Sequence, residues 1–433
     1  MPQPTLRFSK FFLAFAAGLP FLGAISAKAH AEAPAAGAVL ATYADIAKAG
    51  YEDSLEGAKA LQASIGTLLD SPSAETLAAA RKAWIDARAP YMQTEAYRFG
   101  NPIVDDWEGR VNAWPLDEGL IDYVAEAYGG DHPENEFYTA NVIANSTLKV
   151  AGSTVDASEI TPDLIRETLH EAGGIEANVA SGYHAIEFLL WGQDLNGTEP
   201  GAGERPHTDY DPENCSNGNC DRRAAYLRVV TDMLVEDLAW IAEQWGPEGA
   251  ARGAVTEDET DGLTALLTGL GSLTYGELAG ERMKLGLMIH DPEEEHDCFS
   301  DNTHNSHYGN ALGIRNVYLG SYKRTDGSVV SGPSVSDLVR AKSPETDDAV
   351  RAAMDKTMAQ MGVLVERAKT VEAYDQMIGL GNAEGNAVVQ KTIDLLVAQA
   401  KELERAIAVL DLKGIAFEGS DSLDNPGLVE GAQ

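Results

Sequence analysis

Apolar residues recur along most of the chain at intervals of three and four, the spacing of a helix with one buried face. The first long run predicts a helix over 37–69, whose apolar side carries Leu55, Ala58, Leu61, Ile65 and Leu68. Ser73 then stands at the N-cap position of a second predicted helix, 76–99. The same spacing predicts helices at 119–128, 134–147, 162–171, 174–192, 220–245, 258–289, 345–367 and 380–411.

Runs of alternating β-branched residues, which are typical of strands, are scarce. We therefore predict an all-α fold, and 433 residues exceed one ordinary core, so we expect two helical bundles. The predicted bundles cover 37–195 and 220–415. The Gly-, Asn- and Pro-rich segment 196–219 connects them, and 416–433 is predicted to be a flexible tail.

A faint internal repeat bears on whether the two bundles are duplicated halves. When Gly182 is laid over Gly280, small residues align, Arg282 falls where His184 stands, and Leu285 falls where Glu187 stands. Duplicated four-helix-bundle-like halves would produce this pattern. Chance similarity between Gly- and Ala-rich helices explains it equally well.

The N-terminus has the features of a targeting segment. Arg7 and Lys10 precede a short apolar stretch, and small residues at 27, 29 and 31 fit a cleavage site. The stretch is too short to span a membrane comfortably, and no other segment is apolar enough to do so. We predict a signal peptide at 1–29, cleaved near Ala29 or Ala31, and a periplasmic or secreted protein.

The net charge and the cysteines of the chain limit the functions that it can have. Lys plus Arg is 32 and Asp plus Glu is 68, so the formal charge is −36, which argues against nucleic-acid binding and favours cationic ligands or solubility. Cys215 and Cys220 bracket a turn-rich S-N-G-N, as expected for a small disulfide loop in an oxidising compartment. Cys298 is then a free thiol, unless it replaces one of them in a longer bridge.

The stretch G-Y-H-A-I-E-F-L-L-W (182–191) carries the first candidate chemistry. His184 and Glu187 are three residues apart, so a helix presents both on one face, beside an apolar turn. Titratable groups buried there need a partner, which could be a metal ion or simply another side chain. Two donors do not make a metal site, so further ligands must come from elsewhere.

A second helical face supplies candidates for those ligands. Trp84, Arg88, Tyr91 and Glu95 are spaced four, three and four apart. We expect Glu95 to be the third metal donor, with Asp117 as a further candidate. Arg88, Tyr91 and Arg282 are candidates for contacting the bound group. Ion pairs at a bundle seam would produce the same face.

The third cluster is H-D-P-E-E-E-H-D-C-F-S-D-N-T-H-N-S-H (290–307). It holds four of the nine histidines and six acidic residues. This density of His, Asp and Glu could bind a transition metal. A solvated acidic loop is the alternative interpretation.

The motif G-x-H-x-x-E beginning at Gly182 resembles the signature of the imelysin family. The segments G-E-L-A-G-E-R-M (276–283), C-F-S-D-N-T-H (298–304) and N-C-S-N-G-N-C-D-R-R-A-A-Y-L (214–227) are similar to its iron-regulated protein A branch. The resemblance covers most of the mature chain. It implies two helical bundles with the motif at their interface, and an extracytoplasmic protein linked to iron uptake. It also implies metallopeptidase activity in some relatives.

Three functions follow as hypotheses. The first is a periplasmic protein that binds a metal ion through His184, Glu187, Glu95 and Asp117, with a membrane transporter or periplasmic protein as partner. Hard oxygen donors favour iron, with zinc as an alternative. Heme on His184 is a further alternative, although no C-x-x-C-H is present.

The second hypothesis is a metallopeptidase, which needs three ligands and an open water position. The third is a metal-free module binding a peptide, sugar or partner protein, with Trp84, Tyr91, Trp107 and Trp114 lining its cleft.

Overall fold

The computed structural model describes residues 33–130, 132–133, 135–150 and 153–430. The predicted signal peptide therefore lies outside the described residues. The all-α prediction is confirmed, because the named strands pair only as two short antiparallel hairpins: β1 (Thr147–Val150) with β2 (Ser153–Asp156), and β3 (Ser321–Lys323) with β4 (Val329–Ser331). No helix in the described ranges combines the length and apolarity that crossing a bilayer requires.

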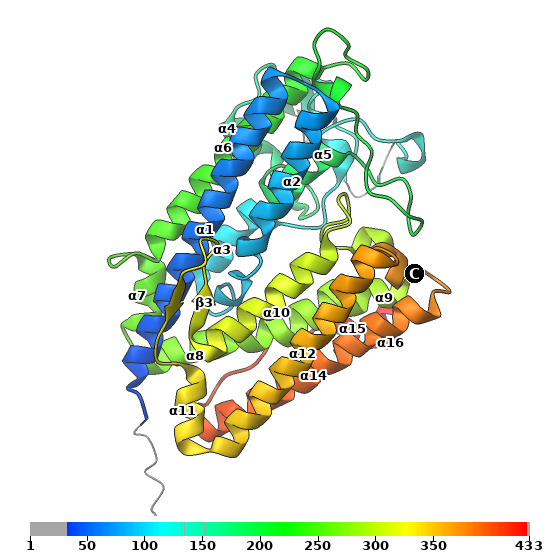
Figure 1. Cartoon of the computed structure of the whole chain (residues 1–433). Coiled ribbons are helices and arrows are strands. Elements are labelled where there is room, and N and C mark those ends of the chain that lie inside the picture. Colours follow the sequence, from blue (N-terminus) through cyan, green and yellow to red (C-terminus); the bar gives the residue numbers. More distant parts are fainter. Residues whose placement is uncertain (1–32, 131, 134, 151–152, 431–433) are drawn as a thin grey trace, which may run out of the picture. The chain divides into compact units, whose positions relative to one another are not determined.

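A first group of helices packs around the long N-terminal helix α1. Helices α2 and α6 lie along α1, and α5 contacts both of them (Figure 1). The capping box of Ser73 and Thr76 begins α2, as the sequence predicted for Ser73. The group consists of α1 (Ala36–Asp70), α2 (Ala74–Tyr91), α3 (Pro102–Asn112), α5 (Gly182–Trp191), α6 (Cys220–Gln244) and α7 (Ala250–Thr256).

A second group is built around α14. Helix α14 packs on α12 and on a π-helical stretch, η7, that continues α8, while α10 packs on α12 (Figure 1). The group consists of α8 (Glu259–Ser272), η7 (Leu273–Leu285), α9 (Gly286–Ile289), α10 (Thr303–Leu319), α12 (Pro344–Thr370) and α14 (Ala383–Leu410). The remaining α-helices are short: α4 (Pro162–Leu164), α11 (Val335–Lys342), α13 (Tyr374–Ile378), α15 (Asp421–Asp424) and α16 (Pro426–Glu430).

Short 3₁₀ and π turns join these helices. They are η1 (Glu95–Tyr97), η2 (Glu118–Leu120), η3 (Glu126–Tyr128), η4 (Ile165–Leu169), η5 (Ala172–Gly174), η6 (His207–Tyr210) and η8 (Pro292–Glu294).

Helix α10 links the two groups, because it contacts α2 and η1 on one side and α12 and η7 on the other. Two glycines make this close packing feasible. A Cβ added to Gly313 would lie 2.4 Å from the backbone oxygen of Gln93, and one added to Gly309 would lie 2.7 Å from the Cβ of Met92. The absence of side chains at these positions lets the middle of α10 approach the chain just after α2.

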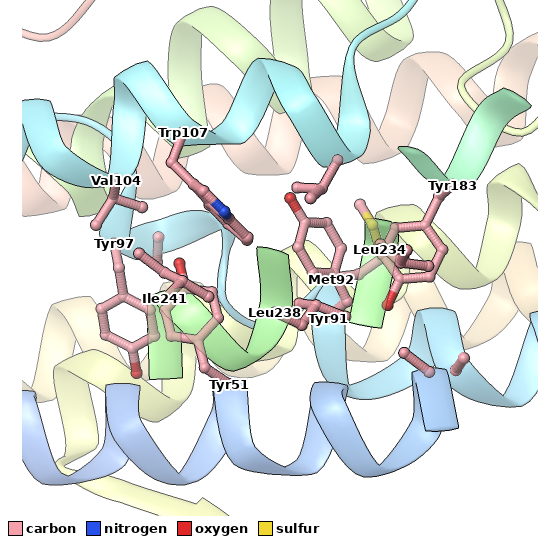
Figure 2. Packing of buried hydrophobic residues seen from close by; sticks show 14 of the residues in the cluster. Tyr51, Tyr91, Met92, Tyr97, Val104, Trp107, Tyr183, Leu234, Leu238 and Ile241 are labelled. Carbon is pink, nitrogen blue, oxygen red and sulfur yellow. The ribbon is translucent and has the colours of Figure 1, made fainter. Parts of the chain in front are cut away.

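Aromatic side chains fill much of the core between helices of the first group (Figure 2). The ring centroids of Tyr51 and Trp107 are 5.7 Å apart, and those of Tyr91 and Tyr183 are 4.9 Å apart. These separations fall in the range of favourable aromatic pairs. A second, mainly aliphatic and methionine cluster lies between η7, α10, α12, α13 and α14. Tyr91, predicted to contact a bound group, is thus a core residue at 1% exposure.

The predicted elements agree with the structure where the apolar spacing is long and regular. Helices α1, α6, α12 and α14 match the runs 37–69, 220–245, 345–367 and 380–411. Where a helix was predicted at 134–147, residues 135–146 form a series of turns that leads into β1. The cluster at 290–307, for which a solvated acidic loop was one interpretation, leads into α10, which begins at Thr303. Although α6 follows the predicted linker, it packs on α1 and α5, and the boundary at 196–219 stays a prediction.

Specific bonds, together with the buried Tyr210, hold the segment between α5 and α6 in place. Arg205 and Arg223 both donate to the buried Asp122, over 2.7 and 2.6 Å, and Cys215 and Cys220 form the predicted disulfide. The segment 416–433, predicted to be a flexible tail, also makes hydrogen bonds in its described part. Ser422 Oγ, for example, donates to the Gly280 carbonyl over 3.0 Å.

We predict that Gly182→Ala destabilises the fold more than Gly197→Ala does. Both glycines have positive φ, +84° and +61°, which costs a substituted alanine about 1 kcal/mol. A Cβ at Gly182 would also lie 2.5 Å from the Val111 carbonyl oxygen, whereas nothing lies within 4 Å of one at Gly197. Urea unfolding of both variants measures the difference. Equal losses would mean that the contact with Val111 relaxes without cost.

Candidate metal centre

Helix α5 presents His184 and Glu187 together in the interior. The helix begins at Gly182, whose φ of +84° few other residues adopt, and ends before Gly192, whose φ is +74°. His184 is 1% exposed and Glu187 is 0% exposed. His184 Nδ1 lies 3.0 Å from Glu187 Oε2, so the two side chains share a face, as their spacing indicates.

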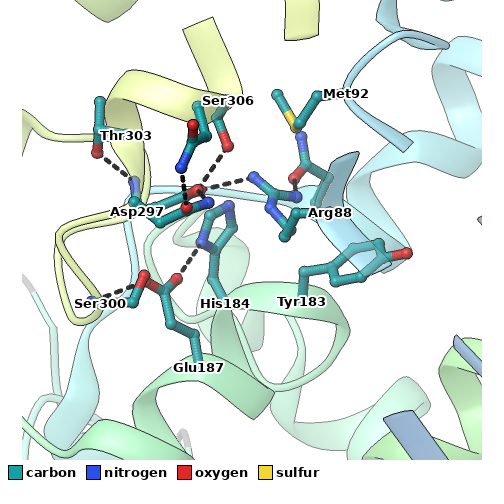
Figure 3. Close-up of polar contacts among 12 residues, drawn as sticks. Arg88, Met92, Tyr183, His184, Glu187, Asp297, Ser300, Thr303 and Ser306 are labelled. Carbon is teal, nitrogen blue, oxygen red and sulfur yellow. Dashed lines mark hydrogen bonds and ion pairs between the residues drawn. The ribbon is translucent and has the colours of Figure 1, made fainter. Parts of the chain in front are cut away.

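Glu187 is held on both of its oxygens. The backbone N–H and the hydroxyl of Ser300 donate to Oε1, over 3.0 and 2.6 Å, while Oε2 faces His184 Nδ1 (Figure 3). With the proton on Nδ1, the imidazole donates to this carboxylate and leaves a bare lone pair on Nε2. His184 Nε2 is buried and has no hydrogen-bond partner. Glu187 therefore orients the imidazole, in the way that outer carboxylates orient metal-binding histidines.

His296 and Asp297 complete a group of three donors with His184. One ligand atom from each residue lies within 4.8 Å of the other two, and all three residues are buried. The His296 ring centroid is 4.8 Å from that of His184, and neither His296 nitrogen has a hydrogen-bond partner. Both new residues come from the cluster at 290–307, so its density of histidines and acids was the sequence signal for them.

Asp297 is fixed from several directions. Arg88 Nη2 donates to its Oδ1 over 2.7 Å, and Asn302 and the Ser306 hydroxyl donate to its Oδ2 (Figure 3). Its backbone N–H donates to Thr303 Oγ1 over 2.9 Å. The ion pair with Arg88 ties α2 to the segment that precedes α10. Arg88 anchors one of the candidate ligands, and its contact with a bound group stays a prediction.

Burial sets the protonation of the histidines. It lowers the pKa of His184 to about 3, with Arg88 as the next cause, and it lowers the pKa of His296, with Arg282 as the next cause. Both imidazoles are therefore neutral at pH 7, the form that binds metal ions.

The pKa values of the two carboxyl groups shift in opposite directions. Burial opposes the charge on Asp297, yet the Arg88 guanidinium holds the pKa of that carboxyl below its usual range. Burial raises the pKa of Glu187, and the nearby Asp297 raises it further. Asp297 is therefore the carboxylate that keeps its negative charge within the donor group.

Two residues expected as ligands have other partners. Glu95 lies in η1 and accepts from Arg282 Nη2 over 2.7 Å. Arg282 also donates to Asn310 over 2.9 Å, and its charge lowers the pKa of His296, so it lies beside the donor group without joining it. Asp117 accepts from Asn135. The structure thus brings His184 and Glu187 together and leaves Glu95 and Asp117 out of the three-donor group.

A surface pocket of about 360 Å³ lies between α2 and α10. Its lining includes Arg88, Asn302 and Ser306, the three side chains that donate to Asp297. Side chains in the wall of the pocket therefore hydrogen-bond directly to a candidate ligand.

Fold and site together define an all-helical protein with a buried histidine–carboxylate centre held between helices. The sequence model of the Imelysin family matches residues 47–403, which is most of the chain. The chain therefore belongs to the imelysin family.

Relatives agree with this assignment. The iron-regulated protein A of Synechococcus elongatus is 23% identical over 306 residues, a match that spans 68% of this chain and 66% of that protein, just under two thirds of its length. A crystal structure of a putative iron-regulated protein A precursor from Parabacteroides distasonis has a TM-score of 0.59 at 18% identity, over 87% of this chain and 96% of that one. An imelysin-like protein from Psychrobacter arcticum gives 0.55 at 14% identity, over 89% and 100% of the two chains. These two structures share the fold.

We predict that Arg88→Met destabilises the protein by about 3–5 kcal/mol, because it leaves the Asp297 charge buried without its cation. Adding Asp297→Asn should recover a large part of that loss, since the asparagine carries no charge. Urea unfolding of the two single variants and the double variant forms a double-mutant cycle. Strictly additive losses would show that the pair is not coupled.

Proposed function

We propose that this protein binds a metal ion, with iron as the ion it handles, through His184 Nε2, an imidazole nitrogen of His296 and a carboxylate oxygen of Asp297. The observation that carries the proposal is the convergence of these three buried donors within 4.8 Å. His184 Nε2 and both His296 nitrogens also lack any other partner.

Unpaired buried nitrogens support the proposal on energetic grounds. Folded proteins give nearly every buried polar group a hydrogen-bond partner, because an unsatisfied one costs about 1–3 kcal/mol. His184 and His296 are 1% and 2% exposed and fully neutral at pH 7. A bound cation would use these lone pairs and would also offset the charge on Asp297.

The donor set bears on the choice of ion. Two histidines and one carboxylate with open positions are the ligands typical of non-heme Fe(II). The sequence indicated a carboxylate-rich site with one imidazole, whereas the donors that converge here are two imidazoles and one carboxylate. Zinc binds such a set too, and more tightly by the general order of divalent affinities. The name of the Synechococcus relative, iron-regulated protein A, favours iron as the ion handled in the cell.

A location outside the cytoplasm is part of the proposal. The predicted signal peptide at 1–29 directs export, and the Cys215–Cys220 disulfide is stable in an oxidising compartment. An iron-binding protein there would pass its ion to a membrane transporter or to another periplasmic protein. This partner stays a prediction.

The metal-binding proposal accounts for the contacts of Glu187 and Arg88 better than the alternatives do. A metallopeptidase would need a carboxylate free to activate water, but both Glu187 oxygens are already engaged by Ser300 and His184. A metal-free binding module would be favoured by an ion pair between Arg88 and Glu187, but Arg88 pairs with Asp297. Heme ligation by His184 stays a prediction.

We predict that metal-stripped protein binds one equivalent of Fe²⁺ under anaerobic conditions, and of Zn²⁺, in titration calorimetry. His184→Ala and His296→Ala should each weaken binding at least about 100-fold by removing a ligand. Glu187→Gln should weaken it about 10–100-fold, since an amide facing Nδ1 favours the tautomer that protonates Nε2. His207→Ala serves as the control, because it removes an imidazole that lies outside the donor group.

Two results of these experiments would change the assignment. Wild-type affinity in folded His184→Ala, with folding checked by circular dichroism, would refute the assigned ligands. Chelator-sensitive cleavage of a peptide by the loaded protein, abolished in Glu187→Gln, would move the assignment to a metallopeptidase.

A further inference from the structure

A second group of acidic side chains lies apart from the histidine centre. Carboxylate oxygens of Glu295, Asp301 and Asp375 lie within 4.8 Å of one another. Glu295 and Asp375 are each 1% exposed, so these are buried carboxyl groups rather than a solvated acidic surface. Glu295 and Asp301 come from the segment before α10, and Asp375 comes from α13.

Four of the six carboxyl oxygens of this acidic group have no hydrogen-bond partner, while Glu295 also has a hydrogen bond with the Thr303 side chain. Glu295 Oε2, Asp301 Oδ1 and both Asp375 oxygens are buried without a hydrogen bond. Within the described residues, the ion pairs of arginine and lysine involve none of the three. The buried Asp122 is the contrast, because Arg205 and Arg223 both donate to it. The acidic group thus lacks the cation that the fold supplies elsewhere.

Such an arrangement is costly if nothing neutralises it. Buried charges in proteins are paired or coordinate metal ions, and like charges at this distance repel. Burial accordingly raises the pKa of Asp375 to about 7 and of Asp301 to about 6, with further contributions from neighbouring carboxylates. Either protons or a cation must neutralise these groups at neutral pH.

We propose that Glu295, Asp301 and Asp375 form a second cation site, separate from the histidine centre, that binds a hard divalent ion such as Ca²⁺. All three donors are carboxylate oxygens, which Ca²⁺ prefers and softer metals do not. Oxygens on opposite sides of a Ca²⁺ ion are about 5 Å apart, at about 2.4 Å from the metal, so donors within 4.8 Å of one another fit around it.

Asp194 extends the site toward α5. Its charge contributes to the raised pKa of both Asp301 and Asp375, so it lies near them, just beyond the C-terminal end of the helix that carries His184. Only its Oδ1 is used locally, by Asn196. Asp194 is not among the three residues whose oxygens lie within 4.8 Å of one another, so water would fill the remaining positions around the ion.

An ion at this position would also stabilise the segment that carries His296 and Asp297. Glu295 has extended backbone angles, φ −78° and ψ 137°, and successive side chains of an extended chain point in opposite directions. Glu295 can therefore serve the acidic group while its neighbour His296 serves the histidine centre. An ion bound by Glu295, Asp301 and Asp375 would fasten this segment to α13 and so fix the backbone that supplies two ligands of the other centre.

The test is thermal unfolding at pH 7.5, with chelator and then with millimolar Ca²⁺. We expect Ca²⁺ to raise the wild-type Tm by about 5 °C. Asp375→Asn and Asp301→Asn should lose this shift, and His184→Ala, the control for the other centre, should retain it. In chelator, Asp375→Asn should be at least as stable as wild type, because it removes one carboxylate from an uncompensated group. That result would also demonstrate that the variant folds.

Other outcomes would overturn the inference. Absence of a Ca²⁺-dependent shift in the wild type, confirmed by calorimetry, would mean that protons alone neutralise the group. An unchanged shift in Asp375→Asn would place bound Ca²⁺ elsewhere. The proposed function fails separately: if Fe²⁺ and Zn²⁺ do not bind but the Ca²⁺ shift depends on Asp375, the second site stands and the histidine centre does not.

Discussion

The buried ion pair between Arg88 and Asp297 is the contact on which the site depends. The two side chains are 1% and 0% exposed, and the contact joins residues 209 positions apart in the chain. A charge in that environment is tolerated only with a partner, so each residue fixes the place of the other. The pair holds the segment before α10 against α2, and that segment brings His296 and Asp297 to the histidine already placed by α5.

The remaining polar contacts orient His184 and hold Asp297. Ser300 and Glu187 set the orientation of His184, while Asn302 and Ser306 occupy the second oxygen of Asp297. These contacts all act on the candidate ligands, and none involves His184 Nε2 or a nitrogen of His296. The protein thus orients the candidate donors by outer bonds and leaves the imidazole nitrogens themselves free, which is the arrangement expected of a preorganised binding site.

Sequence reasoning reached the parts of this arrangement that depend on local spacing. The three-residue interval of His184 and Glu187 gave their shared face, and regular apolar spacing gave helices such as α1 and α14. The same periodicity placed Glu95 on a helical face where the structure does not have it. It assumed one helix over 76–99, whereas α2 contains Pro90 and ends at Tyr91, so Glu95 leaves the expected face and pairs with Arg282.

Helix α10 was missed for a different reason. Its first half is rich in Asn, His and Gly, which have low helix propensity, and the residues just before it are acidic. Gly309 and Gly313 are favoured there because the chain at Met92 and Gln93 approaches too closely for larger residues, a long-range contact that no local pattern reveals. The fold also has the means to neutralise buried charge, as Arg205 and Arg223 do for Asp122. Buried donors are left unpaired in two separate groups although pairing them internally would have made the protein more stable, which is why both groups are proposed as cation sites.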